Sequence, residues 1–285
     1  MSIAPPTTVR EAWATRIISR SKNAKEPAMD LGIAGKTALV CASTAGLGAA
    51  TGRALAAEGV RVVFSGRRKE LATQQAEQYA GCVGIEADLS TVEGAKNLVE
   101  EAEAAVGQID ILVLNGPGPR PGTATSVDTE DLHHAFESLM VVQHALVEDC
   151  LPHMRDQKWG RVLSIASSGV VAPITSLALS SVGRMALAGY LKALANEVSK
   201  DGVTVNMLLP GRIATDRLNS LDAKRAETTG MTLEEIQREV ARTIPVGRSG
   251  EPDEYGAVAA FLCSQLASYV TGSAIRCDGG AHSAL

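Results

Sequence analysis

A strand, a glycine-bearing turn and a helix follow one another near residue 40, and this order constrains the fold more than any other feature. The apolar run Lys36–Cys41 predicts a buried strand, and the alanine-rich stretch ending near Glu58 predicts a helix. A second apolar run, Arg61–Phe64, then completes a βαβ unit, which requires two parallel strands. The chain therefore has the start of an open α/β sheet.

The turn inside this unit has the pattern of a phosphate-binding loop. Backbone N–H groups at the start of a helix bind a pyrophosphate, and glycines let the phosphates approach the backbone. We predict that the turn binds a cofactor through Ala42, Ser43, Thr44, Gly46, Leu47 and Gly48. A Gly-rich turn also occurs in proteins without a ligand, so the prediction depends on the residues around it.

Two arginines follow the second strand and indicate which dinucleotide the turn would hold. A site selective for NAD places an acidic residue at this strand end, where it binds the ribose 2′-hydroxyl. Here no acid is present, and Arg67 and Arg68 come directly after Gly66. Because guanidinium groups bind phosphate well, we predict NADP(H) as the cofactor in preference to NAD(H).

The βαβ pattern continues to the end of the chain. Further strands are predicted at Val83–Glu86, Ile109–Leu114, Arg161–Ile165, Val203–Leu209 and Ser273–Cys277, with helices between them at Thr91–Val106, Thr129–Arg155, up to Ser199 and at Pro252–Ala267. We predict an α/β fold, a single-domain Rossmann-type doubly wound parallel sheet. A polar segment at about residues 213–248, with a helical pattern at Thr232–Ala241, is predicted to be a mobile lid.

Composition narrows the possible partners and the location. The net charge is −5, so no broad basic field exists to hold nucleic acid, and no apolar run is long enough to span a membrane. The five cysteines lie far apart without a CxxC pair, which argues against a metal site and is typical of a cytoplasmic protein. We assign residues 1–28 to a flexible N-terminal extension and residues 29–285 to the Rossmann domain.

Taken together, these motifs resemble the short-chain dehydrogenase/reductase (SDR) family over about residues 30–282. The resemblance rests on Ala42-x3-Gly46-Leu-Gly48, Asp88-Leu89, Asn115, Trp159 to Ser167, Val205-Asn206, Pro210-Gly211, Tyr269-Val-Thr-Gly272 and Asp278-Gly-Gly280. It implies a nicotinamide cofactor, a small-molecule substrate and a homo-oligomer, a tetramer or a dimer. It also implies that Asp88, Leu89 and Asn115 lie by the adenosine, and that Pro210, Gly211, Ile213 and Thr215 lie by the nicotinamide.

The chain departs from the family at the reacting residues, which are usually Asn, Ser, Tyr and Lys. Ser167 matches the serine, but the family spacing then leads to Ser180 at the tyrosine position and Arg184 at the lysine position. Ser138 occupies the position of the asparagine, and no YxxxK sequence occurs anywhere in the chain. A first glycine of the turn is also replaced, by Ala42. The family proton donor is therefore missing.

These replacements leave three functions open. In the first, an NADP-dependent oxidoreductase interconverts a carbonyl and an alcohol with an atypical Ser/Ser/Arg site, and the proton comes from water, Ser180 or a residue such as His133 or His134. In the second, the fold serves a non-redox lyase or dehalogenase-like enzyme. In the third, the protein binds cofactor but is catalytically weak. We favour the first, because the Pro210–Thr215 motif and a lid are present. Apolar residues after Ser167 suggest a small hydrophobic or cyclic substrate.

Overall fold

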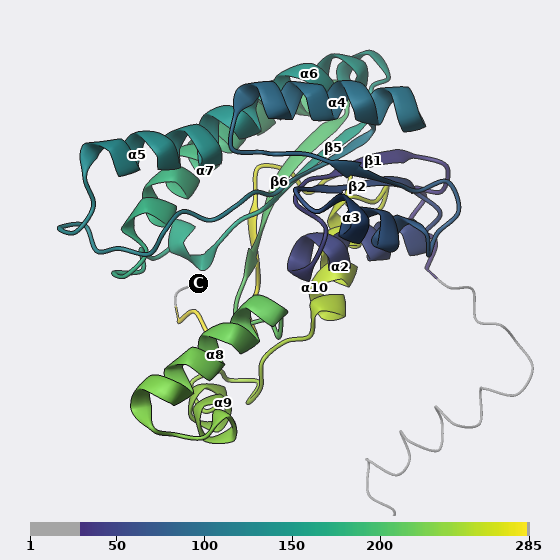
Figure 1. Cartoon of the computed structure of the whole chain (residues 1–285). Coiled ribbons are helices and arrows are strands. Elements are labelled where there is room, and N and C mark those ends of the chain that lie inside the picture. Colours follow the sequence, from purple (N-terminus) through teal and green to yellow (C-terminus); the bar gives the residue numbers. More distant parts are fainter. Residues whose placement is uncertain (1–28, 284–285) are drawn as a thin grey trace, which may run out of the picture. The chain divides into compact units, whose positions relative to one another are not determined.

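The computed structural model describes residues 29–283, so the predicted extension over residues 1–28 lies outside them. Residues 31–283 form one compact unit around a parallel sheet (Figure 1). Its strands are β1 (Thr37–Val40), β2 (Arg61–Gly66), β3 (Val83–Glu86), β4 (Ile111–Leu114), β5 (Gly160–Ile165), β6 (Val203–Pro210) and β7 (Ala274–Cys277). Their order across the sheet is β3-β2-β1-β4-β5-β6-β7, and every neighbouring pair is parallel. This confirms the predicted doubly wound sheet.

Helices cover both faces of the sheet, as parallel strands require. One face packs against α4 (Val92–Val106), α6 (Val142–Asp156) and α7 (Ala178–Val198), and the other against α2 (Gly46–Ala57), α3 (Lys69–Ala76) and α10 (Pro252–Leu262). Strand side chains alternate between the two faces, so Leu39 and Leu112 belong to the first core and Val40 and Val113 to the second. The sheet order reverses between β1 and β4, which opens a crevice at the carboxyl ends of the strands.

The long helix predicted over Thr129–Arg155 is interrupted. Helix α5 (Thr129–Phe136) passes into a π-helical turn (Glu137–Val141) before α6 begins. The Ser138 hydroxyl, inside this turn, donates a hydrogen bond to the carbonyl of His134 at 2.9 Å. Serine bonding back to the preceding turn competes with the regular helical ladder and bends a helix, which fits the local change of pitch.

The predicted lid contains two helices rather than one. Helix α8 (Asp216–Thr229) precedes α9 (Leu233–Ala241), which matches the expected helical pattern. The lid leaves and rejoins the domain at one point, because Ala214 N–H bonds to Gly250 O at 2.8 Å and Gly250 N–H bonds to Arg212 O at 2.9 Å. A buried ion pair between Arg212 and Asp222 ties α8 to this point. The lid base is therefore fixed to the domain.

Candidate active site

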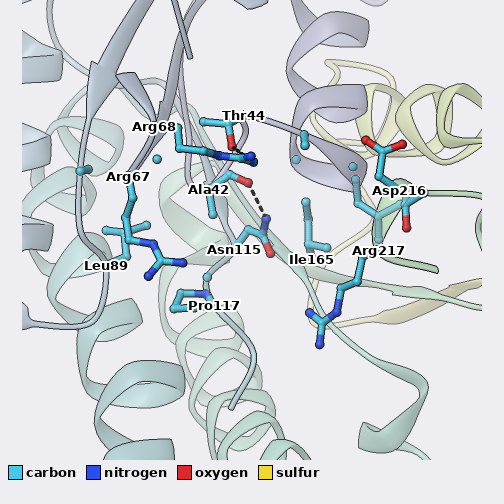
Figure 2. Close-up of a pocket in the computed structure, with 18 of the residues that line it drawn as sticks. Ala42, Thr44, Arg67, Arg68, Leu89, Asn115, Pro117, Ile165, Asp216 and Arg217 are labelled. Carbon is cyan, nitrogen blue, oxygen red and sulfur yellow. Dashed lines mark hydrogen bonds between the residues drawn. The ribbon is translucent and has the colours of Figure 1, made fainter. Parts of the chain in front are cut away.

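A cavity of about 680 Å³ lies along the carboxyl ends of the strands, from the residues after β3 to those of β5 (Figure 2). Its volume is within the range of small-molecule and cofactor sites. Twenty-one residues line it: Ala42, Thr44, Ala45, Gly46, Leu47, Gly48, Gly66, Arg67, Arg68, Ala87, Asp88, Leu89, Asn115, Gly116, Pro117, Ile165, Ala166, Arg184, Thr215, Asp216 and Arg217. Four of them are arginines and two are aspartates, so the wall favours an anionic ligand.

The turn after β1 is shaped by backbone geometry. Gly46 has φ +59°, in the left-handed region that favours glycine, and Ala42 adopts φ +47° although it carries a side chain. At Gly48 a Cβ would lie 2.6 Å from the carbonyl oxygen of Ala42, so only glycine lets α2 start this close to the turn. No described side chain caps α2 at its N-cap residue, Ala45. The first N–H groups of α2 are thus left for a phosphate.

The two arginines after β2 stand at the same end of the cavity. Figure 2 shows Arg68 beside Thr44 and Arg67 on the side of Leu89. Arg68 Nη2 lies 3.5 Å from Thr44 Oγ1, and neither guanidinium takes part in an ion pair among the described residues. Both side chains are exposed, so they are free to reorient towards a phosphate on a bound nucleotide.

The middle of the cavity lies between the ends of β1, β3 and β4. Asp88 and Leu89, which follow β3 and were predicted to lie by the adenosine, both line it. Asn115, directly after β4, also lines it and donates from Nδ2 to the carbonyl of Ala42 at 3.1 Å (Figure 2). This bond joins the β4 end to the turn after β1, so Asn115 holds the two halves of the cavity together.

At the far end of the cavity, by β5, Arg184 is the one member of the predicted Ser/Ser/Arg group that belongs to the lining. Arg184 donates from Nη1 to the carbonyl of Ile165 at 3.1 Å and from Nε to the Ser180 hydroxyl at 3.3 Å. Burial lowers the pKa of Arg184, and the charge of Arg217 lowers it further. Ser167 follows the lining residue Ala166, and its Oγ accepts a hydrogen bond from Gly169 N–H at 3.1 Å. Its own O–H remains available as a donor.

Several predicted residues lie behind the cavity wall. Ser43 is fully buried, and its hydroxyl donates to Val40 O and accepts from Ser65 N–H, so it joins β1 to β2 instead of facing a ligand. Ile213 belongs to the core, and Gly211 N–H bonds to Cys277 O at 2.9 Å. The remaining residues outside the lining are Pro210, Ser138, Ser167, Ser180, His133 and His134; the two histidines are exposed. Thr215 does line the cavity and caps α8.

Two site features escaped prediction from the sequence. Arg217 lines the β5 end together with Arg184, and its nearness in sequence to Thr215 was the available signal. Gln143 is only 3% exposed, and its Nε2 would lie 3.2 Å from a Cβ placed on Gly116 of the cavity wall. Both amide atoms of Gln143 are without a hydrogen-bond partner in the described part of the chain. A polar residue inside an apolar helical stripe was the sequence signal for Gln143.

The parallel sheet, the glycine turn at the start of α2 and the cavity across the point where the strand order reverses define a Rossmann-type protein. Comparison with known proteins refines this class. The family described as enoyl-(acyl carrier protein) reductase matches residues 41–282. The chain belongs to the short-chain dehydrogenase/reductase family. It is therefore an oxidoreductase by family.

Three relatives illustrate this membership. The 3-oxoacyl-(acyl-carrier-protein) reductase FabG of Aquifex aeolicus is 33% identical over 258 residues, which is 88% of this chain and 99% of the relative. The human dehydrogenase/reductase SDR family member 4 is 30% identical over 283 residues, 96% of each chain. The L-sorbose reductase of Gluconobacter frateurii, solved with NADPH and L-sorbose, superposes with a TM-score of 0.84 at 30% identity, over 90% of this chain and 100% of that one.

Proposed function

We propose that this enzyme is an NADP-dependent oxidoreductase that interconverts a carbonyl and an alcohol on a small hydrophobic or cyclic substrate, with Ser167, Ser180 and Arg184 at its reacting end. One observation carries the proposal. A single cavity joins the arginines after β2 and the uncapped start of α2 to Arg184 beside β5. Its length along the sheet suits a dinucleotide, with the adenosine at β2 and the nicotinamide at β5.

The donor set in the cavity fits NADP(H). The N–H groups of Gly46, Leu47 and Gly48 would hold the pyrophosphate, and the Cβ that Gly48 lacks would push the turn away from α2. Arg67 and Arg68 would hold the 2′-phosphate. When bound, the nicotinamide supplies or accepts the hydride. NADPH is also bound by the L-sorbose reductase that superposes on this chain.

The protein side chains then have to stabilise the negative charge that develops on the substrate oxygen and to supply its proton. Arg184 keeps a permanent cation at the β5 end, where it stabilises negative charge that develops on that oxygen. Ser167 donates a hydrogen bond to the same oxygen. The Ser180 oxygen accepts a hydrogen bond from Arg184 Nε, so the Ser180 O–H points away from Arg184 and is available as a donor. The proton that the substrate oxygen takes up then comes from Ser180 or from water.

Exposed apolar side chains near Ser167 support a hydrophobic substrate. Val171 and Ile174, in the segment between β5 and α7, are 45% and 38% exposed.

On the outer side of α7, Val182 and Met185 are also exposed, at 46% and 44%, which fits a homo-oligomer. No described helix is long and apolar enough to cross a membrane, and we propose a cytoplasmic location. Light scattering of the purified protein tests the oligomer.

Replacing Arg67 and Arg68 by alanine tests the cofactor assignment. The loss of two charge-assisted contacts weakens NADPH binding by about 100-fold and leaves NADH binding nearly unchanged. Fluorescence titration measures both constants, and Lys69→Ala, an exposed cation next in the chain, is the matched control. Equal affinity of the unmodified protein for NADPH and NADH would contradict the assignment. NADPH binding without turnover on a broad carbonyl and alcohol panel would favour the catalytically weak alternative.

A further inference from the structure

Arg217 spans the cavity between the lid and the loop after β4. It is the second residue of α8, and a Cβ placed on Gly118 would lie 3.4 Å from its Nη1 and 3.5 Å from its Nη2. Arg217 lines the cavity together with Pro117 and Ile165. Figure 2 shows its side chain running from α8 past Ile165, away from Asp216. Its guanidinium is therefore at the β5 end of the cavity.

A second guanidinium, that of Arg184, lines the same end. The two cations interact, because the charge of Arg217 adds to the burial that lowers the pKa of Arg184. Arg184 donates hydrogen bonds to the Ser180 hydroxyl and to the carbonyl of Ile165, and neither acceptor carries a charge. Arg217 is solvent-exposed, so water screens part of the repulsion between the two charges, and an anion between the guanidiniums would remove the rest.

Arg217 also differs from the other arginines around it. The lid and its base hold four arginines in ion pairs, Arg212 with Asp222, Arg225 with Glu239, Arg238 with Glu234 and Arg248 with Glu254. Arg217 makes no ion pair or hydrogen bond with any residue that the structure describes. Among the arginines at positions 212–248, Arg217 and Arg242 have no ion pair with the described residues, and of these two only Arg217 lines the cavity.

We propose that Arg184 and Arg217 form an anion subsite, and that the substrate is a carbonyl compound or alcohol that carries a carboxylate. This inference rests on the proposed oxidoreductase function and names its substrate class. Guanidinium groups bind a carboxylate through paired hydrogen bonds, which also fix its orientation. Leu221 lies one turn after Arg217 on the same face of α8 and is 56% exposed, so an apolar body beside the carboxylate is accommodated.

The same chemistry has a second possible source, the pyrophosphate of the cofactor. That group is expected at the start of α2, and Gly46 lies near Thr215, two residues before Arg217. The observations favour the substrate, because the Arg217 guanidinium lies by Gly118, in the loop after β4, and not at the start of α2. The two sources predict opposite effects of one substitution, so a single variant separates them.

The test compares Arg217→Met with Lys224→Met, which removes an exposed cation outside the cavity from the same helix. The holoenzyme, saturated with NADP⁺ to prevent turnover, is titrated calorimetrically with oxamate, benzoate and phenylglyoxylate, and with benzamide as the neutral probe. We expect at least one carboxylate to bind saturably and its Kd to rise about tenfold or more in Arg217→Met, with Lys224→Met like the unmodified protein. Benzamide should not distinguish the three proteins.

Three results would overturn the subsite, and a fourth would overturn the proposed function on which it rests. If no carboxylate binds, or if Arg217→Met leaves all the Kd values unchanged, the substrate class is wrong while the proposed function stands. If Arg217→Met weakens NADPH binding and spares the carboxylates, Arg217 serves the cofactor instead. If the unmodified protein does not bind NADP(H) at all, the proposed function itself fails.

Discussion

The two ends of the cavity are built in different ways. At the β2 end the cavity combines the main-chain N–H groups at the uncapped start of α2, beside the left-handed turn at Gly46, with the side chains of Arg67 and Arg68. At the β5 end the charged groups in the cavity lining are the side chains of Arg184 and Arg217, and Ser180, outside the lining, accepts a hydrogen bond from Arg184. Main-chain geometry depends on a few small residues, whereas side-chain chemistry changes with each substitution. The binding end can therefore stay constant while the reacting end diverges.

The frame around the β5 end is closely packed. A Cβ on Gly183 of α7 would lie 2.8 Å from Leu139 of the π-helical turn, so the two helices are in close contact. Arg184 is still anchored to the last carbonyl of β5. Positions 180 and 184 thus lie in a close-packed frame, and we expect Tyr and Lys at these positions to change chemistry more than fold.

The largest effect is expected from Ser180→Tyr combined with Arg184→Lys. The pair restores a phenol whose pKa is lowered by a nearby cation, and a positioned proton donor contributes about 100-fold or more to rate. We expect kcat for carbonyl reduction to rise by about that factor, measured by NADPH oxidation. Ser180→Phe with Arg184→Lys is the control without the hydroxyl. An unchanged kcat with intact NADPH binding would show that position 180 does not face the reacting oxygen.

The next largest effect is expected from Gly48→Ala, which alters the main chain of the binding end. In Gly48→Ala the new methyl would meet Ala42 O at 2.6 Å, which forces the turn and α2 apart. We expect a loss of about 2 kcal/mol in the free energy of unfolding and a fall of about tenfold in NADPH affinity. Urea denaturation and fluorescence titration measure the two. Gly189→Ala, on α7 with no atom within 4 Å of its Cβ, should not destabilise the protein.

Ala42→Gly is expected to have a smaller effect of opposite sign. Ala42 has φ +47°, where a side chain is strained, and glycine relieves that strain while making the unfolded chain more flexible. The net result should be a gain of about 0.5 to 1 kcal/mol in the free energy of unfolding. Thermal unfolding at neutral pH measures it, and a lower Tm would mean that the turn tolerates alanine without strain.

The smallest effect is expected where the lid rejoins the domain. The hydrogen bonds from Arg248 lower the pKa of Glu254 to about 2 from its ordinary 4.5. A lowered carboxylate pKa stabilises the fold above the ordinary value and ceases to do so as the pH falls towards about 2. Glu254→Gln should therefore lower Tm slightly at pH 7, and the difference should narrow below pH 4.5. A constant difference across this range would exclude the charge as the cause.

The sequence predicts the binding end better than the reacting end. The strands and the turn follow from apolar runs and glycines, and the predicted cofactor-binding residues Gly46, Gly48, Arg67 and Arg68 all line the cavity. Ser43 was predicted to bind the cofactor, but its hydroxyl joins β1 to β2, and no local sequence pattern encodes that tertiary contact.

Helix α8 was missed for a related reason. Its buried residue is Asp222, paired with Arg212, and a buried charge leaves no hydrophobic periodicity to detect. The position of Arg217 depends on α8, so its approach to Arg184 could not be predicted either. Hydrophobic periodicity in the sequence thus predicts helices and strands that are stabilised by apolar packing, and it misses those that are stabilised by ion pairs.

A crystal structure of the enzyme with NADPH tests the central claim most directly. We expect the 2′-phosphate against Arg67 or Arg68, the pyrophosphate at the start of α2, and the nicotinamide beside Ile165 with Arg184 within hydrogen-bond reach of the cofactor. We also expect that no tyrosine lies near the nicotinamide C4 atom. A cofactor bound in the reverse direction, or an Arg184 turned away from it, would contradict the division of the cavity into a binding end and a reacting end.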